Sequence, residues 1–172
     1  MAELWDVLDK DRNFTGRLHK RGWLKPGDYH LIVHVWIVNE KGEFLISQRS
    51  SDPKRRWPGK WACTKGSAVA GDDSLTTALK ETREELGIIL GPDSGQLFAQ
   101  FRRDNDDGSG RFIDAWLFRQ EVDIATVVFQ PEETCDAMWA SKSQIKKMME
   151  TGDFVPEVAY PYLDVLFELC EG

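Results

Sequence analysis

Three glutamates that share one face of a helix are the residues of this chain best suited to metal chemistry. Glu81, Glu84 and Glu85 stand at i, i+3 and i+4, so a helix projects their carboxylates from one side of a single turn. Such a cluster is unfavourable alone, because like charges repel and the C-terminal end of a helix disfavours anions. Mg²⁺ prefers a few carboxylates together with substrate phosphates. The cluster therefore predicts a divalent-cation site, and a solvated face neutralised by Lys80 and Arg83 is the alternative.

The helix that must carry these glutamates is well marked in the sequence. Asp73 or Ser74 can cap its start, and Gly87 can end it in a left-handed conformation. Apolar positions at spacings of three and four form the stripe that should face the core, namely Leu75, Ala78, Leu79, Thr82 and Leu86.

The stretch from Gly66 to Ile88 resembles the Nudix box, the signature of the MutT-like Nudix hydrolase family. That pattern is a glycine, five residues, a glutamate, seven residues, and then Arg-Glu-aliphatic-any-Glu-Glu-any-Gly-aliphatic. The matching positions are Gly66, Glu81, Glu84, Glu85, Gly87 and Ile88. Asp72 replaces the first glutamate, Lys80 replaces the arginine, and Thr82 replaces an aliphatic residue. Because lysine lacks the planar fork of a guanidinium, it should orient the acidic cluster less firmly.

The resemblance implies an α/β/α sandwich with a central mixed β-sheet, and hydrolysis of a nucleoside diphosphate linked to a further group. The ligands that it implies for Mg²⁺, or for Mn²⁺ in its place, are the carbonyl of Gly66 and the carboxylates of Glu81, Glu84 and Glu85. Such an ion neutralises the diphosphate and lowers the pKa of an attacking water. The general base is one of these glutamates or lies outside the box, at Glu132 or Glu133. We take Glu133 as a further catalytic residue; a solvated loop start is the alternative for this pair.

One basic island interrupts the acidic chain, around the loop between residues 50 and 60. Its members are Arg49, Lys54, Arg55, Arg56 and Lys60. The guanidinium fork suits phosphate oxygens, so the island is a candidate anion-binding loop. The residues that we assign to substrate binding are Arg49, Lys54, Arg55 and, directly before the box glycine, Lys65. A merely solvated loop is the alternative for each member. We assign no base-stacking role to the aromatic residues, Trp57 and Trp116 among them.

The chain outside the box is similar to the Nudix branch nearest isopentenyl-diphosphate isomerase. The similarity covers LWDVLDKDRNFTGRLHKRG, HVWIVNEKGEFLISQR and WPGKW. An isomerase of this branch uses a cysteine directly before the box glycine and a histidine directly after it, where this chain has Lys65 and Ser67. Its acid–base glutamate would align near Asp114, and His30 matches a metal ligand whose partner position holds Trp23. Hydrolysis is therefore the first hypothesis. Isomerase activity and a non-catalytic nucleotide-binding module are the alternatives.

Length and composition indicate a single domain over residues 1–172. Of the 172 residues, 41% are hydrophobic and 30% are charged, as in ordinary globular proteins. The net charge of −7 argues against nucleic-acid and anionic-membrane binding. The sequence shows no secretory signal, no apolar run near the roughly 20 residues that span a bilayer, and three cysteines without paired spacing. We therefore expect a cytoplasmic protein that acts on a small-molecule nucleotide or diphosphate.

Strands should surround the glutamate-bearing helix. β-Branched and aromatic residues predict a buried central strand over residues 29–39, followed by a turn and a strand over 43–49. The other expected elements are a hairpin within 4–17, strands at 61–66, near 96–101 and at 111–120, a further candidate strand at 124–129, and helices at 141–150 and 162–170. A homodimer paired through the N-terminal hairpin is compatible with this pattern.

Overall fold

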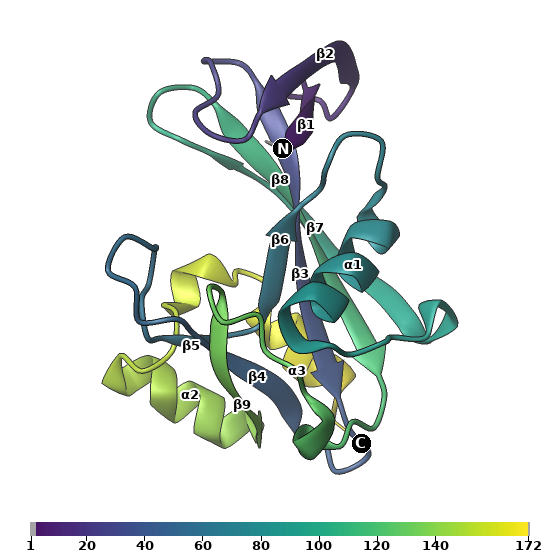
Figure 1. The fold of residues 1–172 in the computed structure, drawn as a ribbon, viewed down its shortest axis with the longest axis vertical. Coiled ribbons are helices and arrows are strands. Elements are labelled where there is room, and N and C mark those ends of the chain that lie inside the picture. Colours follow the sequence, from purple (N-terminus) through teal and green to yellow (C-terminus); the bar gives the residue numbers. More distant parts are fainter. Residues whose placement is uncertain (1–2, 172) are drawn as a thin grey trace.

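A mixed β-sheet runs through the centre of the molecule (Figure 1), as the computed structural model, which describes residues 3–171, shows. The nine strands in these residues are β1 (Leu4–Leu8), β2 (Phe14–Lys20), β3 (Tyr29–Val38), β4 (Phe44–Arg49), β5 (Trp61–Ala62), β6 (Thr64–Ser67), β7 (Gly95–Asp104), β8 (Gly110–Arg119) and β9 (Thr134–Ala140). The main path is β2-β1-β3-β4-β5, and β6, β7, β8 and β9 attach to it. Only β3 and β8 pair in parallel among these strands, so the sheet is mixed, as expected.

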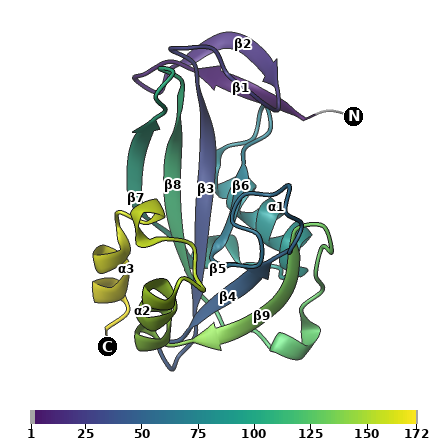
Figure 2. The same ribbon diagram turned by 90° about the vertical axis from the view of Figure 1, so that its left-hand side faces the viewer.

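Three helices in the described residues cover the two faces of the sheet: α1 (Ser74–Leu86), α2 (Lys142–Thr151) and α3 (Leu163–Leu169). Side chains of β3 alternate between the faces, so Val35 packs in one core with Ala78 of α1, and Trp36 packs in the other with Ile145 of α2 and Leu166 of α3. Figures 1 and 2 show α1 on one side of the sheet and α2 and α3 on the other. The α/β/α sandwich is therefore confirmed.

The ends of α1 and α2 follow the capping signals of the sequence. The Asp73 carboxylate accepts a backbone N–H of the first turn of α1, and Gly87 ends the helix at a φ of 67°. Ser141 and Gln144 form a capping box at the start of α2, and Gly152 closes it at a φ of 84°. Over residues 3–171, none of the helices has the length and apolar character needed to cross a membrane.

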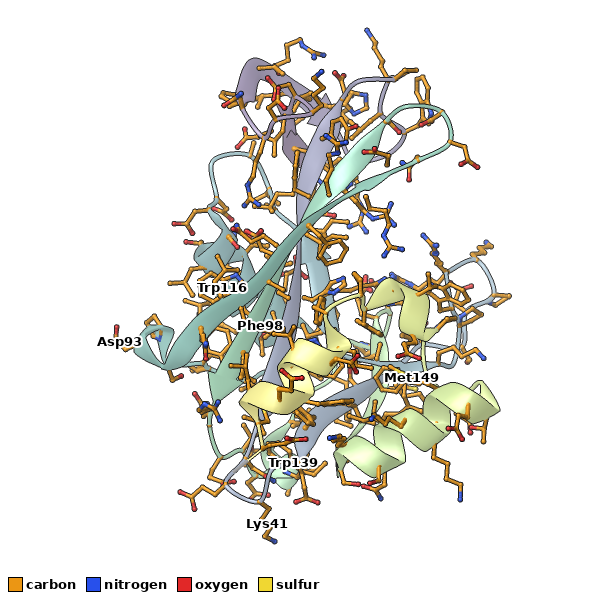
Figure 3. All side chains as sticks on the ribbon, turned by 180° about the vertical axis from the view of Figure 1, so that it is seen from behind. Lys41, Asp93, Phe98, Trp116, Trp139 and Met149 are labelled. Atoms are coloured by element: carbon orange, nitrogen blue, oxygen red, sulfur yellow. The ribbon has the colours of Figure 1, made fainter. Side chains whose placement is uncertain are left out.

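Two aromatic side chains tie the helices to the sheet (Figure 3). The indole N–H of Trp116 on β8 donates to Ser74 Oγ at 2.8 Å, which holds the start of α1 against the sheet. Phe98 on β7 packs edge-on against Tyr162 just before α3, with ring centroids 5.2 Å apart. Trp116 is therefore a structural residue that positions α1, the helix with the glutamate cluster.

Two predicted elements differ from the structure. The expected single strand over residues 61–66 is divided, because β5 pairs with β4 whereas β6 pairs with β3, and the chain crosses between them at Cys63. The candidate strand at 124–129 is wrong. Ile124–Thr126 forms a 3₁₀ turn capped by Asp123, and the Val128 N–H donates to the Leu86 carbonyl. This segment therefore packs on the end of α1 and adds no strand to the sheet.

The N-terminal hairpin of β1 and β2 is confirmed and lies across the end of the long strands β3 and β8 (Figure 2). Arg12 in its turn has a φ of 69°, a conformation that is unusual for a residue other than glycine. Its guanidinium donates to both carboxylate oxygens of Asp114 at 2.7 and 2.6 Å, and Asp114 is 0% exposed. Arg17 holds Asp28 in the same two-bond manner. The hairpin is thus fastened to the body by two charged pairs.

Candidate active site

A cavity of about 290 Å³ opens on the sheet beside α1 and the loop between β4 and β5. Its floor consists of alternating side chains from three strands: His30, Ile32 and His34 of β3, Lys65 and Ser67 of β6, and Arg111 and Ile113 of β8. A larger cavity of about 470 Å³ lies at the β3–β4 turn and contains none of the box residues. The smaller cavity is therefore the candidate active site.

The structure brings most of the predicted site residues to this cavity. Those that line it are Arg49, Arg55, Lys65, Gly66, Glu85 and Glu133. Glu81 lies directly behind Gly66, because a Cβ atom built on Gly66 would overlap the Glu81 carboxyl group. Glu84 and Lys54 are exposed and lie outside the lining. The box glutamates therefore divide into an inner pair and an outward-facing member.

Crowding and burial make the inner pair of glutamates costly to ionise. Burial, followed by the charge of Glu84, raises the pKa of Glu81 to about 7. Burial, followed by Glu81 and Glu133, raises the pKa of Glu85 well above its usual value. Carboxylates held together against their own repulsion gain from a nearby cation. A cation bound beside Glu81 and Glu85 would therefore stabilise their ionised forms.

The donor set fits a hard divalent cation that shares its coordination with substrate. Within residues 3–171, no three His, Cys, Asp or Glu side chains converge into a ready-made metal cluster. Mg²⁺ does not require one, because it retains waters and commonly binds one or two carboxylates plus phosphate oxygens. Glu81, Glu85 and the backbone of Gly66 offer only oxygen donors, beside a glycine whose missing side chain leaves room for the Glu81 carboxylate. These residues are therefore compatible with Mg²⁺.

Glu133 is the member of the Glu132–Glu133 pair that reaches the site. It lines the cavity, whereas Glu132 is exposed. Its carboxylate accepts from Arg55 Nη1 at 2.6 Å, and both side chains are about three-tenths exposed, at 27% and 29%. The backbone N–H of Ser50 donates to the Glu133 carbonyl at 2.9 Å, which fixes this residue to the basic loop. A phosphate in the cavity would compete with Glu133 for the Arg55 guanidinium.

The three departures from the box are accommodated locally. Lys80 donates to Asp72 at 2.6 Å, so the two substituted charged residues pair with each other and not with the glutamates. Thr82 is 0% exposed, and its hydroxyl donates to the Ala78 carbonyl at 2.9 Å. That bond satisfies a polar group at a position where an aliphatic side chain is usual. Within residues 3–171, none of the three side chains forms a hydrogen bond or ion pair with the carboxylates of Glu81 or Glu85.

Several cavity residues were not identified from the sequence. Arg21 lines the cavity from the end of the N-terminal hairpin, Arg103 from β7 and Arg111 from β8. They lie far apart in the chain, at positions 21, 103 and 111, so no local pattern relates them, and only the folded strands bring them together. The alternation of the predicted strand over 111–120 was a usable signal, because it places Arg111 and Ile113 on one face.

Trp57 also lines the cavity, and its backbone is strained. Its φ of 57° lies in the left-handed region, which bulky side chains rarely adopt. The following Pro58 further restricts the backbone of Trp57, because a residue before proline favours extended conformations. Such strain costs on the order of 1–3 kcal/mol and is concentrated at functional sites. The guanidinium of Arg56 lies 5.4 Å from the centre of the Trp57 ring. Trp57 therefore lies at the rim of the cavity, whereas Trp116 does not line it.

Lys65 is a partly buried cation that forms no ion pair with a carboxylate within residues 3–171. Burial, followed by the charge of Arg49, lowers the pKa of Lys65 to about 8. An anion bound in the cavity would restore the preference of this amine for its charged form. This environment agrees with the assignment of Lys65 to substrate binding.

The positions that matter for isomerase chemistry are occupied differently. Asp114 is enclosed by Arg12 and Gln100 and does not line the cavity. Cys63 is buried, and burial raises the pKa of its thiol to about 12, so it is a poor nucleophile. His30 stacks on Trp5 with ring centroids 3.9 Å apart. The acid–base pair of the isomerases is therefore missing from this site.

The fold and the cavity, with two partly buried glutamates beside several arginines, can now be compared with known proteins. The NUDIX domain family matches residues 28–159, most of the chain. The protein belongs to the Nudix hydrolases, enzymes that hydrolyse phosphoanhydride bonds.

Individual relatives support this membership. An uncharacterized Nudix hydrolase of Listeria monocytogenes is 38% identical over 169 residues, which cover 97% of this chain and 95% of the relative. The crystal structure of DR0079 from Deinococcus radiodurans has the same fold, with a TM-score of 0.73 at 19% identity over 99% of this chain and 100% of that chain. An isopentenyl-diphosphate isomerase of Escherichia coli is 30% identical over only 82 residues, 47% of this chain and 44% of the isomerase. The similarity to the isomerase is thus partial.

Gly66→Ala should separate the function of this site from its stability. The added Cβ would displace the flexible end of Glu81, so we expect the melting temperature to change little while turnover of any hydrolysed substrate falls at least tenfold, since a 1 Å misplacement can cost about 10²-fold. Gly91→Ala is the matched control, because its Cβ would meet only Ser94 Oγ at 3.6 Å. Full activity in Gly66→Ala would show that the position of Glu81 is unimportant.

Proposed function

We propose that this enzyme is a Mg²⁺-dependent pyrophosphohydrolase that cleaves the diphosphate linkage of a nucleoside diphosphate derivative. The observation that carries the proposal is the pair of desolvated glutamates, Glu81 and Glu85, at the edge of a cavity lined by arginines. Glu81, Glu85 and Gly66 would hold the ion, with Mn²⁺ as a substitute, and Glu84 would join from the exposed side. When bound, the ion supplies charge neutralisation for the diphosphate and a more acidic water.

The remaining roles belong to side chains of the cavity. Arg49 and Lys65 bind phosphate oxygens; the Arg49 Nε is held by the Arg56 carbonyl at 2.9 Å, which orients its fork. Arg55 alternates between Glu133 and substrate, and its release leaves Glu133 free to accept a proton from water. Lys54 is assigned a weaker, outer contact because it is exposed. Trp57 at the rim is placed to pack on the group attached to the diphosphate.

Location, partners and oligomeric state belong to the same proposal. Cys63, Cys135 and Cys170 are free thiols in the structure, which supports the prediction of a reducing, cytoplasmic location. Small nucleotides are the expected partners, and the acidic chain disfavours nucleic acid. A homodimer paired through β2, an edge strand of the sheet, and a single domain over residues 1–172 stay predictions.

A substrate panel tests the proposal. Purified protein is incubated with Mg²⁺ and nucleoside diphosphates, nucleoside triphosphates, nucleotide sugars, dinucleotides and isopentenyl diphosphate, and the products are separated by ion-exchange chromatography. We expect cleavage of at least one diphosphate, abolished by EDTA and restored by Mg²⁺ or Mn²⁺. Isomerised isopentenyl diphosphate without hydrolysis would favour the isomerase reading. Binding of nucleotides without turnover of any would favour the non-catalytic module.

A further inference from the structure

Two arginines line the cavity from strands that carry no residue of the Nudix box. Arg103 on β7 and Arg111 on β8 stand directly opposite each other in the antiparallel register. Like charges at directly opposed positions destabilise a sheet. Within residues 3–171 neither arginine forms an ion pair; Arg103 donates to the Val158 carbonyl at 2.8 Å and Arg111 to Asn105 at 3.2 Å. The fold therefore maintains an uncompensated pair of guanidinium groups.

The positive charge of the cavity exceeds what a metal-bound diphosphate requires. The cations of the lining are Arg21, Arg49, Arg55, Arg56, Lys65, Arg103 and Arg111, whereas its carboxylates are Glu85 and Glu133. Arg21 pairs with Glu3 at 3.3 Å and Arg55 pairs with Glu133 at 2.6 Å. A diphosphate linkage that has bound a divalent cation retains little net charge, so it cannot neutralise the other lining cations. The excess indicates a substrate with a further anionic group.

The location of that group is set by the two opposed arginines. The register places both side chains on one face of the β7–β8 ladder, and burial, followed by the charges of Arg103 and Arg56, lowers the pKa of Arg111. A planar guanidinium fork binds phosphate oxygens through two hydrogen bonds, and two such forks can share one phosphoryl group. An anion between them would replace repulsion with attraction.

We propose that Arg103 and Arg111 form a second anion subsite, which binds a phosphoryl group of the substrate other than the diphosphate that is cleaved. The substrate class is therefore a diphosphate whose attached nucleoside carries an additional phosphate. This inference rests on the proposed function for the cleaved bond, but the subsite itself is defined by β7 and β8.

Matched substrates that differ by a single phosphate test the subsite in the intact enzyme. We compare kcat/KM for coenzyme A with dephospho-coenzyme A, and for NADPH with NADH, because these pairs place the extra phosphate on the ribose 3′ and 2′ oxygens. The wild-type enzyme should favour the phosphorylated member of at least one pair by about tenfold or more, the effect of one or more charge-assisted hydrogen bonds. Arg103→Gln/Arg111→Gln should abolish this preference by raising KM for the phosphorylated member to that for the unphosphorylated one.

Two controls accompany this comparison. Arg119→Gln is the matched variant, because Arg119 lies on β8 outside the cavity and donates to the Leu169 carbonyl; it should retain the preference. The double variant removes a like-charge pair, so its melting temperature should lie near or above that of the wild type. Either single variant, Arg103→Gln or Arg111→Gln, serves if the double variant does not fold.

A binding experiment separates failure of the subsite from failure of the hydrolase assignment. Calorimetry without Mg²⁺ measures the affinities for AMP, adenosine 3′,5′-bisphosphate and adenosine 2′,5′-bisphosphate. Tighter binding of either bisphosphate by about tenfold, lost in the double variant, supports the subsite even if no diphosphate is hydrolysed. The subsite is overturned if AMP binds as well as both bisphosphates, if none of the three binds, or if the preference survives in the double variant.

Discussion

Glu85→Gln should lower kcat by about 10³-fold, within the range expected when a positioned acid–base group is lost, and the loss of a cation ligand adds to it. The variant keeps the shape of the side chain but removes a charge that burial, Glu81 and Glu133 all disfavour. We therefore expect the metal-free variant to melt at a higher temperature than the metal-free wild type. Steady-state kinetics measure the change in kcat, and thermal denaturation without metal measures the change in melting temperature.

The stability readout makes this prediction independent of the substrate. Mg²⁺ should raise the melting temperature of the wild type, because a ligand that binds only the folded state stabilises it, and the rise should be absent in Glu85→Gln. Glu84→Gln, which changes an exposed member of the cluster, should cost less, about 10–100-fold. Glu150→Gln at the exposed end of α2 is the control and should behave as wild type. Equal Mg²⁺ stabilisation of Glu85→Gln and wild type would falsify the role of Glu85 as a cation ligand.

Arg12→Ala should be the most destabilising single change in the N-terminal hairpin. It leaves the carboxylate of Asp114, which is 0% exposed, without its charged partner. Breaking a fully buried pair costs about 3–5 kcal/mol, and this is an upper value here because the Arg12 side chain is 33% exposed and Gln100 still donates to Asp114. In a domain of this size each kcal/mol lowers the melting temperature by roughly 2–4 °C. Denaturant titration and thermal denaturation measure the loss.

The same hairpin supplies the control for this prediction. The Arg21–Glu3 pair has side chains that are 61% and 41% exposed, so Arg21→Ala should cost no more than about 1 kcal/mol. Adding Asp114→Asn to Arg12→Ala should recover part of the lost stability, because the orphaned charge is removed. Equal stability of Arg12→Ala and Arg21→Ala would show that the buried pair contributes nothing beyond an exposed one.

Local patterns in the sequence were sufficient for the helix and the core of the site. The positions of Asp73 and Gly87 fix the ends of α1, and the spacing of Glu81, Glu84 and Glu85 fixes their common face. These features depend on residues within a few positions of one another, so the helix geometry alone relates them. The same holds for the strand β3, whose apolar run is continuous.

Contacts between distant segments could not be predicted from the sequence, because they depend on how the strands pair in the folded sheet. Arg103 and Arg111 meet only through the register of β7 and β8, and Arg12 reaches Asp114 across 102 positions of chain. Composition marked the basic loop but not its orientation, so Lys54 was grouped with Arg49 although it is exposed. Which glutamate of a shared face turns inward depends on neighbouring strands, and Gly66 decides this for Glu81.

The Arg12–Asp114 pair has a practical consequence for truncation. The region recognised as the family domain begins at residue 28 and ends at 159, so a fragment cut at those limits loses Arg12 and also α3. Such a fragment would retain Asp114 in the interior without a counterion and would expose the apolar face that Leu166 and Phe167 cover. We therefore expect the minimal folding unit to be longer than residues 28–159, and shortened versions to aggregate before they can be assayed.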